Sequence, residues 1–474
     1  MEQNNSKNDK RLNELISTYE ELSQQGAVVH LEETEYLEIV QYYQNQNMLD
    51  EALEVISLAI HQNSYSPQLF MRKAELLLTK GYASTALDFL DRAELLDPAD
   101  VHIKMTKIEV MIEQGQQHTA LSMIACLEPL IEKPLLSHLH FLKAEAFEAQ
   151  RAYKKMFRAL AESVRINPDN QNAIKKLWLA AELSGCFQES AQLHQKLLDL
   201  RPYSSIAWYN LGNAYLKLDN LIDAEIAFEY AFITNKHFED AYRDCAEVRI
   251  LMNNYQGALD CYEDMLALFK PEASLFVNIG YCYEKLEQFD FALTCYEKSF
   301  RYNCHYAHAF YRKGMCLWKL GNTVHAAVAI EQALEIQKNN ELYTATLAEL
   351  YCIIGQTEKA DDLYYAATGL RPDESEPWIK YVRFLLDKQR FEDASELMRE
   401  AEMYVQDAEI FYAKAVCFFL TNNKKDALRL LKKALKKEED LYTMTFHLYP
   451  ALKNETEWLL AISTHLLDGK EPRG

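Results

Sequence analysis

The chain has 474 residues, an apolar share of 49% and a net charge of −21, because 71 acidic residues face 50 basic ones. The apolar share suffices for a hydrophobic core and excludes a chain that is disordered throughout. With 13 glycines and 11 prolines, the chain is too poor in turn formers for a sandwich, barrel or propeller, which need a turn about every 8–12 residues. The negative charge also makes a nucleic-acid partner unexpected, because phosphates are bound by clustered Lys and Arg.

The N-terminal segment MEQNNSKNDKRLNELI lacks the apolar stretch of a secretory signal. No segment approaches the ~18 uninterrupted apolar residues of a membrane span. The ten cysteines are scattered and form no CxxC pair. We therefore expect free thiols in a reducing, bacterial-type cytoplasm, and no membrane span.

Residues 1–32 precede a repetitive region and are expected to cap it. The segment Arg11–Gln25 has the apolar spacing of an amphipathic helix. The polar residues 1–10 are expected to form a disordered tail before that helix.

Between residues 33 and 440 the sequence repeats with a period of 34 residues. The twelve expected starts are Glu33, Pro67, Val101, Ser137, Gln171, Ser205, Glu239, Ala273, Ala307, Glu341, Ser375 and Ala408. Ten of the eleven intervals are 33 or 34 residues long, and the interval from 101 to 137 is 36. Positions within a repeat are numbered from these starts, and the length of one repeat fits two helices joined by a turn.

Three positions of the repeat support this arrangement. Position 20 is alanine in ten of the twelve repeats, and position 8 is a small residue in eight, which lets two helices approach closely. Position 15 is glycine or asparagine in eight repeats, namely Asn47, Gly81, Gly115, Gly185, Asn253, Gly321, Gly355 and Asn422. These residues tolerate the left-handed backbone conformation that ends a helix, so position 15 is predicted to end the first helix of each repeat.

Residues 441–474 are expected to cap the last repeat. Asn454 and Glu457 have the spacing of a capping box before the apolar segment 458–462. We expect a final helix there that covers the last repeat, followed by a frayed tail over residues 469–474.

One repeat carries a recognisable motif: the segment Trp208–Tyr215, followed by Ala224, Phe228 and Ala231. It resembles the tetratricopeptide repeat (TPR) family, and the resemblance extends over residues 33–440. It implies an all-α fold, a right-handed α-solenoid of about twelve helix–turn–helix repeats with helical caps. It also implies a concave groove built mainly from the first helix of each repeat, with positions 2, 5, 6, 9, 12 and 13 facing it.

The groove positions of the middle repeats are polar, aromatic and locally basic. They include Asn210, Asn213, Arg243, Asn278, Tyr281, His308, Tyr311 and Arg312. We expect them to bind an extended peptide, with the asparagines bonding its backbone and the two arginines its acidic groups. Two other interpretations remain open: ordinary solvated groove residues, or an Arg243–Glu247 pair along one helix.

The resemblance raises one more specific possibility, because some TPR domains clamp the C-terminal carboxylate of a peptide with five groove residues. Arg243, Asn278 and Arg312 fit that pattern in type or nearly so, and His308 fits it in part. Glu247 departs from the pattern, since a carboxylate at its position repels that of a ligand. The sequence therefore leaves a carboxylate clamp undecided.

The cysteines and histidines favour packing over chemistry. Cys282, Cys316 and Cys417 share position 10, and Cys261 and Cys295 share position 23, which is typical of small apolar core residues. Cys304, His305 and His308 are the nearest approach to a metal cluster, but no second ligand pair stands at zinc spacing. We expect no metal site and no cofactor.

The basic segment Lys424–Lys437 could meet an acidic partner or a membrane surface. Its apolar residues occupy core positions of the repeat, however, which favours a solvated outer face.

No nucleotide-binding loop, nucleophile elbow or HExxH motif is found. We therefore expect a protein that is not an enzyme, a cytoplasmic scaffold that binds a protein or peptide partner in its groove. The alternatives are an accessory or regulatory subunit of an enzyme, or a self-assembling structural protein. The partner's identity and the oligomeric state are left open.

Overall fold

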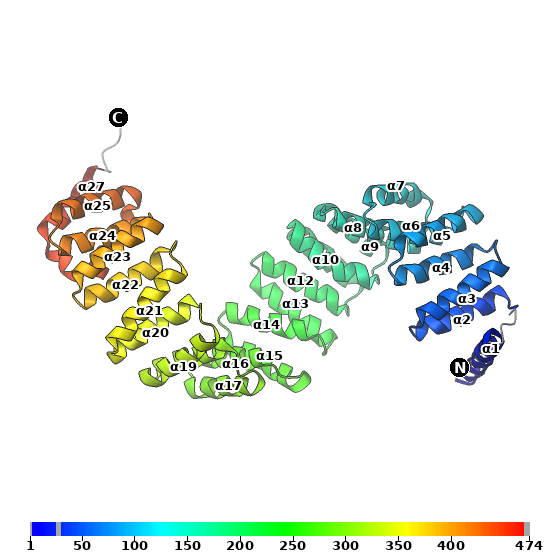
Figure 1. Ribbon diagram of the computed structural model, residues 1–474, viewed down its shortest axis with the longest axis horizontal. Helices are drawn as coiled ribbons and strands as arrows, with labels where there is room; N and C mark the ends of the chain where they lie inside the picture. Colours follow the sequence, from blue (N-terminus) through cyan, green and yellow to red (C-terminus); the bar gives the residue numbers. More distant parts are fainter. Residues whose placement is uncertain (1, 25–29, 469–474) are drawn as a thin grey trace. The chain divides into compact units, whose positions relative to one another are not determined.

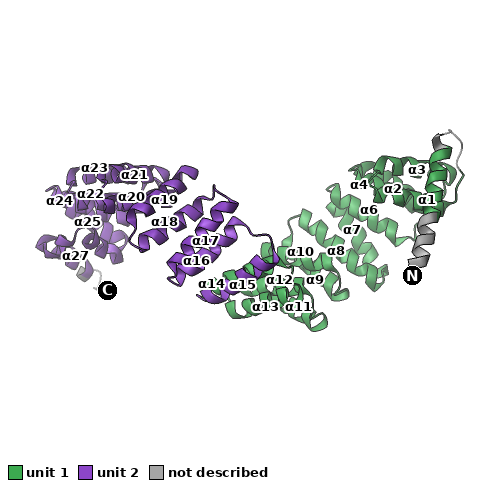
Figure 2. Cartoon of the chain, turned by 90° about the horizontal axis from the view of Figure 1, so that it is seen from below, with its two compact units in different colours: residues 1–252 green, residues 253–474 purple. Residues whose placement is uncertain are grey.

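The computed structural model describes residues 2–24 and 30–468, and within these residues it contains helices and no strand (Figure 1). This confirms the predicted all-α class. The chain divides into two compact units, which we call unit 1 (Met1–Met252) and unit 2 (Asn253–Gly474) (Figure 2). The boundary falls inside the repeat that begins at Glu239.

The helices of unit 1 are α1 (Glu2–Gln24), α2 (Glu33–Asn45), α3 (Leu49–Gln62), α4 (Pro67–Thr79), α5 (Ala83–Leu96), α6 (Val101–Glu113), α7 (Gln117–Leu127), η1 (Glu128–Leu130), α8 (Lys133–Ala149), α9 (Tyr153–Ile166), α10 (Gln171–Ser184), α11 (Phe187–Leu200), α12 (Ser205–Lys217), α13 (Leu221–Thr234) and α14 (Glu239–Leu251).

The helices of unit 2 are α15 (Tyr255–Leu268), α16 (Ala273–Lys285), α17 (Phe289–Tyr302), α18 (Ala307–Lys319), α19 (Thr323–Ile336), α20 (Glu341–Ile354), α21 (Thr357–Leu370), α22 (Ser375–Asp387), α23 (Phe391–Tyr404), α24 (Ala408–Leu420), α25 (Lys424–Lys437), η2 (Glu439–Thr443), α26 (Met444–Leu448), η3 (Pro450–Asn454) and α27 (Thr456–Asp468).

Within each unit, consecutive helices pack against one another as a stack of helix pairs (Figure 1). The first helix of a repeat begins at the expected residue in eleven of the twelve repeats. The exception is α8, which begins at Lys133 and not at the expected Ser137. Pro134 lies in its first turn, where the fixed φ of proline favours helix and its missing N–H costs no hydrogen bond.

The turn at position 15 is the most regular feature of the fold. Positive φ occurs at position 15 in all twelve repeats, including the eight glycine and asparagine positions predicted from the sequence. The other four positions are Arg151, Asp219, Glu287 and Gln389. In the repeat containing Arg151, the next residue, Ala152, donates its N–H to the carbonyl of Phe147 at 2.8 Å, which is the bond of a Schellman cap.

Close approach of the two helices depends on the small residues at positions 8 and 20. The residue at position 20 is fully buried in every repeat. Gly212, at position 8, faces the ring of Phe228, and a Cβ at that glycine would lie 2.7 Å from the ring. A Cβ at Gly280 would likewise lie 2.6 Å from the ring of Tyr296. Any larger residue at these glycines therefore pushes the helices apart.

The N-terminal prediction needs a correction. The helix α1 begins at Glu2, so the disordered tail expected over residues 1–10 is wrong for residues 2–10. No glycine or proline occurs between residues 2 and 24, so nothing in the sequence stops the helix from extending back from Arg11. Ile16 and Tyr19 of α1 are buried in one cluster with Tyr36 and Ile39 of α2, so α1 covers the first repeat.

The C-terminal capping box is also wrong. Asn454 ends η3, and α27 begins at Thr456, where the backbone N–H of Leu459 bonds to the carbonyl of Glu455. The helix nevertheless covers the last repeat: Trp458 is fully buried, with its ring 5.2 Å from that of Phe419 in α24. Residues 469–474, expected to fray, lie outside the described part of the chain.

Candidate functional site

The predicted groove residues divide between the two units. Asn210, Asn213 and Arg243 belong to unit 1, and Asn278, Tyr281, His308, Tyr311 and Arg312 belong to unit 2.

Arg312 is the centre of the unit 2 group. Its Cζ lies 4.6 Å from the centroid of the Tyr281 ring, which is a cation–π contact between α18 and α16. Its Nε donates to Nε2 of His308 at 3.4 Å, one helical turn earlier. Its Nη1 lies 3.8 Å from Oε2 of Glu284, and 27% of the Arg312 side chain is exposed. The guanidinium is thus held from three sides and still reaches solvent.

Glu284 supplies a buried negative charge beside this arginine. It is 7% exposed and accepts a hydrogen bond of 3.0 Å from the hydroxyl of Tyr296. Burial, followed by the charge of Glu284, raises the pKa of the Cys316 thiol to about 12. Burial and then Arg312 lower the pKa of His308, while Glu284 opposes them. His308 is therefore neutral at pH 7 and can accept the hydrogen bond from Arg312.

Aromatic rings extend this group toward the next repeat. Tyr311 is 8% exposed and stacks on Tyr343 of α20, with ring centroids 4.8 Å apart. The ring of His308 lies 6.2 Å from that of Tyr311. Asn278 is half-buried on α16, one turn before Tyr281. Sequence reasoning missed Tyr343, because it stands at position 3 of its repeat, outside the expected groove positions. We call Tyr281, Glu284, His308, Tyr311, Arg312 and Tyr343 the Arg312 cluster.

The unit 1 group differs from expectation, first at Asn210. This side chain is only 3% exposed. Its Nδ2 donates to the carbonyl oxygen of Ile174 at 2.8 Å and lies 3.3 Å from Nε2 of His194. Asn210 therefore joins α12 to α10 and does not face a ligand, which corrects the prediction. Asn213 is half-buried, and its Nδ2 donates to the carbonyl of Tyr209 within the same helix at 3.1 Å.

Arg243 already has acidic partners. Its Nη2 lies 2.6 Å from Oε1 of Glu239, and its Nη1 lies 3.3 Å from Oδ1 of Asp240. The alternative pairing with Glu247 is wrong, because helical side chains lean toward the N-terminus and so reach the preceding turn. Asp244, whose pKa is raised mainly by burial, accepts a 2.6 Å hydrogen bond from Tyr209. These acidic neighbours of Arg243 make the unit 1 group a poor receptor for a carboxylate.

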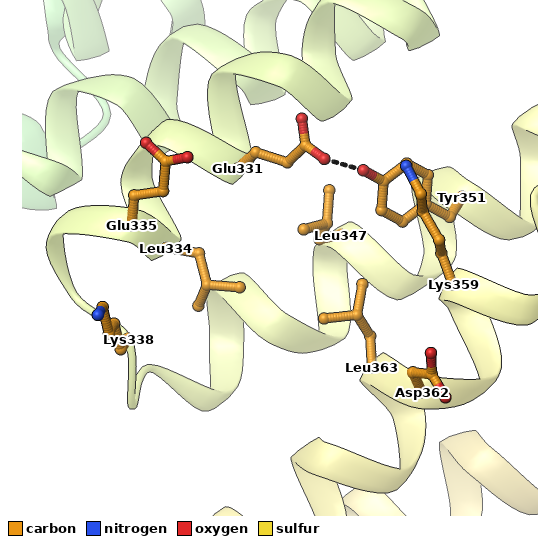
Figure 3. A pocket seen from close by; sticks show the side chains of 9 residues that line it. All are labelled: Glu331, Leu334, Glu335, Lys338, Leu347, Tyr351, Lys359, Asp362 and Leu363. Atoms are coloured by element: carbon orange, nitrogen blue, oxygen red, sulfur yellow. Dashed lines mark hydrogen bonds between the residues drawn. The ribbon is translucent and has the colours of Figure 1, made fainter.

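The structure adds a pocket that sequence reasoning missed, since that reasoning considered the groove of the first helices alone. The pocket lies among α19, α20 and α21 and has a volume of about 540 Å³ (Figure 3). Leu334, Leu347 and Leu363 form its apolar part, and charged side chains surround them. Tyr351 donates to the carboxylate of Glu331.

The remaining candidates behave as packing or outer-face residues. The five cysteines at positions 10 and 23 are buried, which confirms that they pack in the core. Cys304 is exposed, and its Sγ lies 3.1 Å from Nδ1 of His305. The apolar residues of α25 are buried, apart from the half-buried Leu428, and its lysines are exposed. Across residues 2–24 and 30–468, no helix has an apolar stretch long enough to span a bilayer.

Two protein families match parts of the chain. Residues 4–128 match the family described as N-terminal acetyltransferase A, auxiliary subunit. Residues 206–232, 273–303 and 307–340 match the tetratricopeptide repeat family.

Relatives of known name are distant. Anaphase-promoting complex subunit 3 of Schizosaccharomyces pombe is 22% identical over 200 residues, which are 42% of this chain and 30% of that protein. The chain thus spans less than a third of that relative's length. TPR repeat-containing protein MJ1428 of Methanocaldococcus jannaschii is 22% identical over 431 residues, which are 83% of this chain and 68% of that protein.

Among solved structures, yeast Tom70 is similar, with a TM-score of 0.40 and 15% identity, over 92% of this chain and 97% of that one. The three matched repeat segments coincide with the helix pairs that start at Ser205, Ala273 and Ala307. The same pattern recurs in the other pairs, with a fully buried residue at position 20 and positive φ at position 15. The chain is therefore a multi-repeat tetratricopeptide repeat protein.

Proposed function

We propose that this chain is a non-catalytic interaction scaffold that binds an acidic, extended segment of a partner protein at the Arg312 cluster. The observation that carries the proposal is the state of Arg312, which is fixed over Tyr281 while its side chain remains 27% exposed. At 3.8 Å, its contact with Glu284 is an ion pair too long for a hydrogen bond. While Nε bonds to His308, the two Nη groups are thus available to a carboxylate of the partner.

The neighbours of Arg312 suit a peptide ligand. The neutral imidazole of His308 adds no competing charge, and the half-buried amide of Asn278 offers a donor and an acceptor to a peptide backbone. Tyr281 restricts the guanidinium, so less side-chain entropy is lost on binding. Arg243 and Asn210 are not part of this site, because Arg243 already pairs with Glu239 and Asn210 already bonds to Ile174.

The matched families support the non-catalytic part of the proposal. The tetratricopeptide repeat is typical of proteins that bind other proteins, and the acetyltransferase family is named for an auxiliary subunit. We also assign the protein to the cytoplasm. That assignment is supported by its ten cysteines, all of which lie in the described part of the chain and form no disulfide there.

The test uses the full chain and a fluorescent peptide of about 12 residues in which Glu and Pro alternate, since such peptides are extended. Fluorescence anisotropy measures its affinity. We expect Arg312→Ala to weaken binding about tenfold and Arg312→Lys to weaken it severalfold, because lysine lacks the planar fork. A counterpart peptide with Gln in place of Glu should bind weakly to every variant.

The matched control is Arg429→Ala, which removes the same charge from a side chain that is 81% exposed on α25. Its affinity should stay within about twofold of the parent. Equal losses in the two alanine variants, or no loss in either, would contradict the proposal.

The match of residues 4–128 favours a second function, that of an auxiliary subunit which binds an acetyltransferase through unit 1. Co-purification of the chain with the N-terminal acetyltransferase catalytic subunits of its own host tests this directly. Failure to retain any of them while the acidic peptide still binds would leave only the first function.

A further inference from the structure

The second helix of one repeat in unit 1 carries an unusually apolar outer surface. On α13, Ile222, Ile226, Tyr230 and Ile233 are 67%, 44%, 47% and 68% exposed. Their spacing places them along one side of the helix over about 16 Å. No other helix exposes as many large apolar side chains among the residues whose side chains are described. Contiguous exposed apolar surface of this kind is typical of an interaction site. We call these four residues the α13 stripe.

A pocket adjoins the α13 stripe. It has a volume of about 540 Å³, and Trp208, Leu211, Tyr215 and Ile226 are among its lining residues. Ile226 belongs to both the stripe and the pocket. The ring of Trp208 also stacks on that of Tyr230, with centroids 4.7 Å apart. Stripe and pocket therefore form one continuous surface within unit 1.

The charges at this pocket have a single sign. Its lining includes two carboxylates, Asp199 and Asp223, and no lysine or arginine. Asp199 is exposed. Oδ2 of Asp223 accepts a 2.7 Å hydrogen bond from Nδ2 of Asn220. The nearby Glu225 and Glu229 are both paired with Arg249, so that arginine does not neutralise the pocket. An aromatic wall beside two carboxylates is a receptor for a cation.

The unit 2 pocket of Figure 3 has mixed charge, because Lys338 and Lys359 line it together with Glu331, Glu335 and Asp362. The two pockets use the same repeat positions, because each is formed by a second helix and the two helices of the following repeat. Position 19 is Asp223 in unit 1 and Lys359 in unit 2, and Lys338 also lines the unit 2 pocket. The repeat therefore creates the hollow, and the local sequence sets its charge.

We propose that this surface docks a basic amphipathic helix of a partner protein. The helix lays its apolar side chains along the α13 stripe, whose length equals about three helical turns. One of its Lys or Arg side chains enters the pocket, where Asp199 and Asp223 pair with the charge and Trp208 contacts the side chain. A second copy of this chain is a poorer occupant, since its net charge of −21 repels the same carboxylates.

The test uses the full chain and three labelled helical peptides of about 14 residues that share one leucine pattern. Their polar positions are all Lys, all Gln or all Glu. We expect the Leu–Lys peptide to bind most tightly. The double substitution Asp199→Asn with Asp223→Asn should weaken it about tenfold, and Ile222→Ser with Ile233→Ser should weaken it severalfold. All four side chains are exposed, so the variants should fold, which circular dichroism checks.

The matched control is Glu335→Gln with Asp362→Asn, which removes the same charge from the lining of the unit 2 pocket. Its affinity for the Leu–Lys peptide should stay within about twofold of the parent. Equal losses of affinity in the two charge variants would mean that the peptide binds through nonspecific charge attraction, and this would overturn the proposal. Tight binding of the Leu–Glu peptide would also overturn it. So would self-association, seen by light scattering, that the two isoleucine substitutions abolish.

Discussion

Gly314 in α18 and Ile330 in α19 set the spacing of the two helices in their repeat. A Cβ on this glycine would stand 2.5 Å from Cγ1 of Ile330 and 3.1 Å from the carbonyl oxygen of Ala326. Ile330 and Ala326 are fully buried, so neither has room to move. The helices can approach this closely because position 8 carries no side chain.

We expect Gly314→Ala to destabilise α18 and α19. Overpacking costs about 1–3 kcal/mol, and the better helix propensity of alanine returns about 1 kcal/mol, so a net loss of about 1 kcal/mol is expected. Hydrogen exchange of the two helices measures it. Gly369→Ala in α21 is the control, because nothing lies within 4 Å of its added Cβ. That variant should be stabilised, and a loss at both sites would contradict the packing argument.

We expect Glu287→Gly to stabilise unit 2 by about 0.5–1 kcal/mol, since the left-handed conformation is costly for a residue with a side chain. Glu287 has a φ of 59° at position 15. The same change at Glu263, inside α15, should instead cost about 1 kcal/mol. Thermal unfolding of both variants decides the matter, and equal signs would disprove the explanation.

The stability of unit 1 should fall in mild acid because of His194. Burial lowers its pKa to about 4. Between about pH 6.5 and pH 4 the unfolded chain binds a proton there that the folded chain does not, so acid favours unfolding. The loss amounts to about 3 kcal/mol at full protonation and is absent above about pH 6.5. Urea unfolding across this range should show a shallower pH dependence for His194→Gln, and identical profiles would argue against the assignment.

Removal of the C-terminal cap should loosen the last repeat. Trp458 is fully buried against Phe419, so Trp458→Ala should cost about 3–5 kcal/mol. The rate of amide hydrogen exchange in α24 and α25 should rise in this variant. Leu460→Ala changes a side chain that is 62% exposed. It should change the free energy of opening of α24 and α25, measured by hydrogen exchange, by less than about 0.5 kcal/mol. Similar effects of the two substitutions would mean that α27 does not stabilise the repeat through its buried face.

The turns at position 15 show which parts of the fold sequence patterns predict. Eight turns could be predicted because glycine or asparagine stood at position 15, whereas Arg151 and Gln389 gave no such signal and still adopt positive φ. There the repeat forces the conformation, because the second helix must pack back on the first. The candidate site was predicted less well. Arg312 is partly exposed, but Asn210 is buried and bonds to the carbonyl of Ile174, which lies 36 residues earlier.

The sequence by itself determined the period, the helix pairs and the small residues between them, because these depend on spacing within one repeat of 34 residues. Tertiary structure decided which polar groups remain available, since each side chain meets partners from neighbouring repeats. It joined Arg312 to Tyr281 and Glu284 of the preceding repeat, and it tied Asn210 to the carbonyl of Ile174. It also created the pocket beside Trp208, because a hollow between successive second helices belongs to two repeats at once.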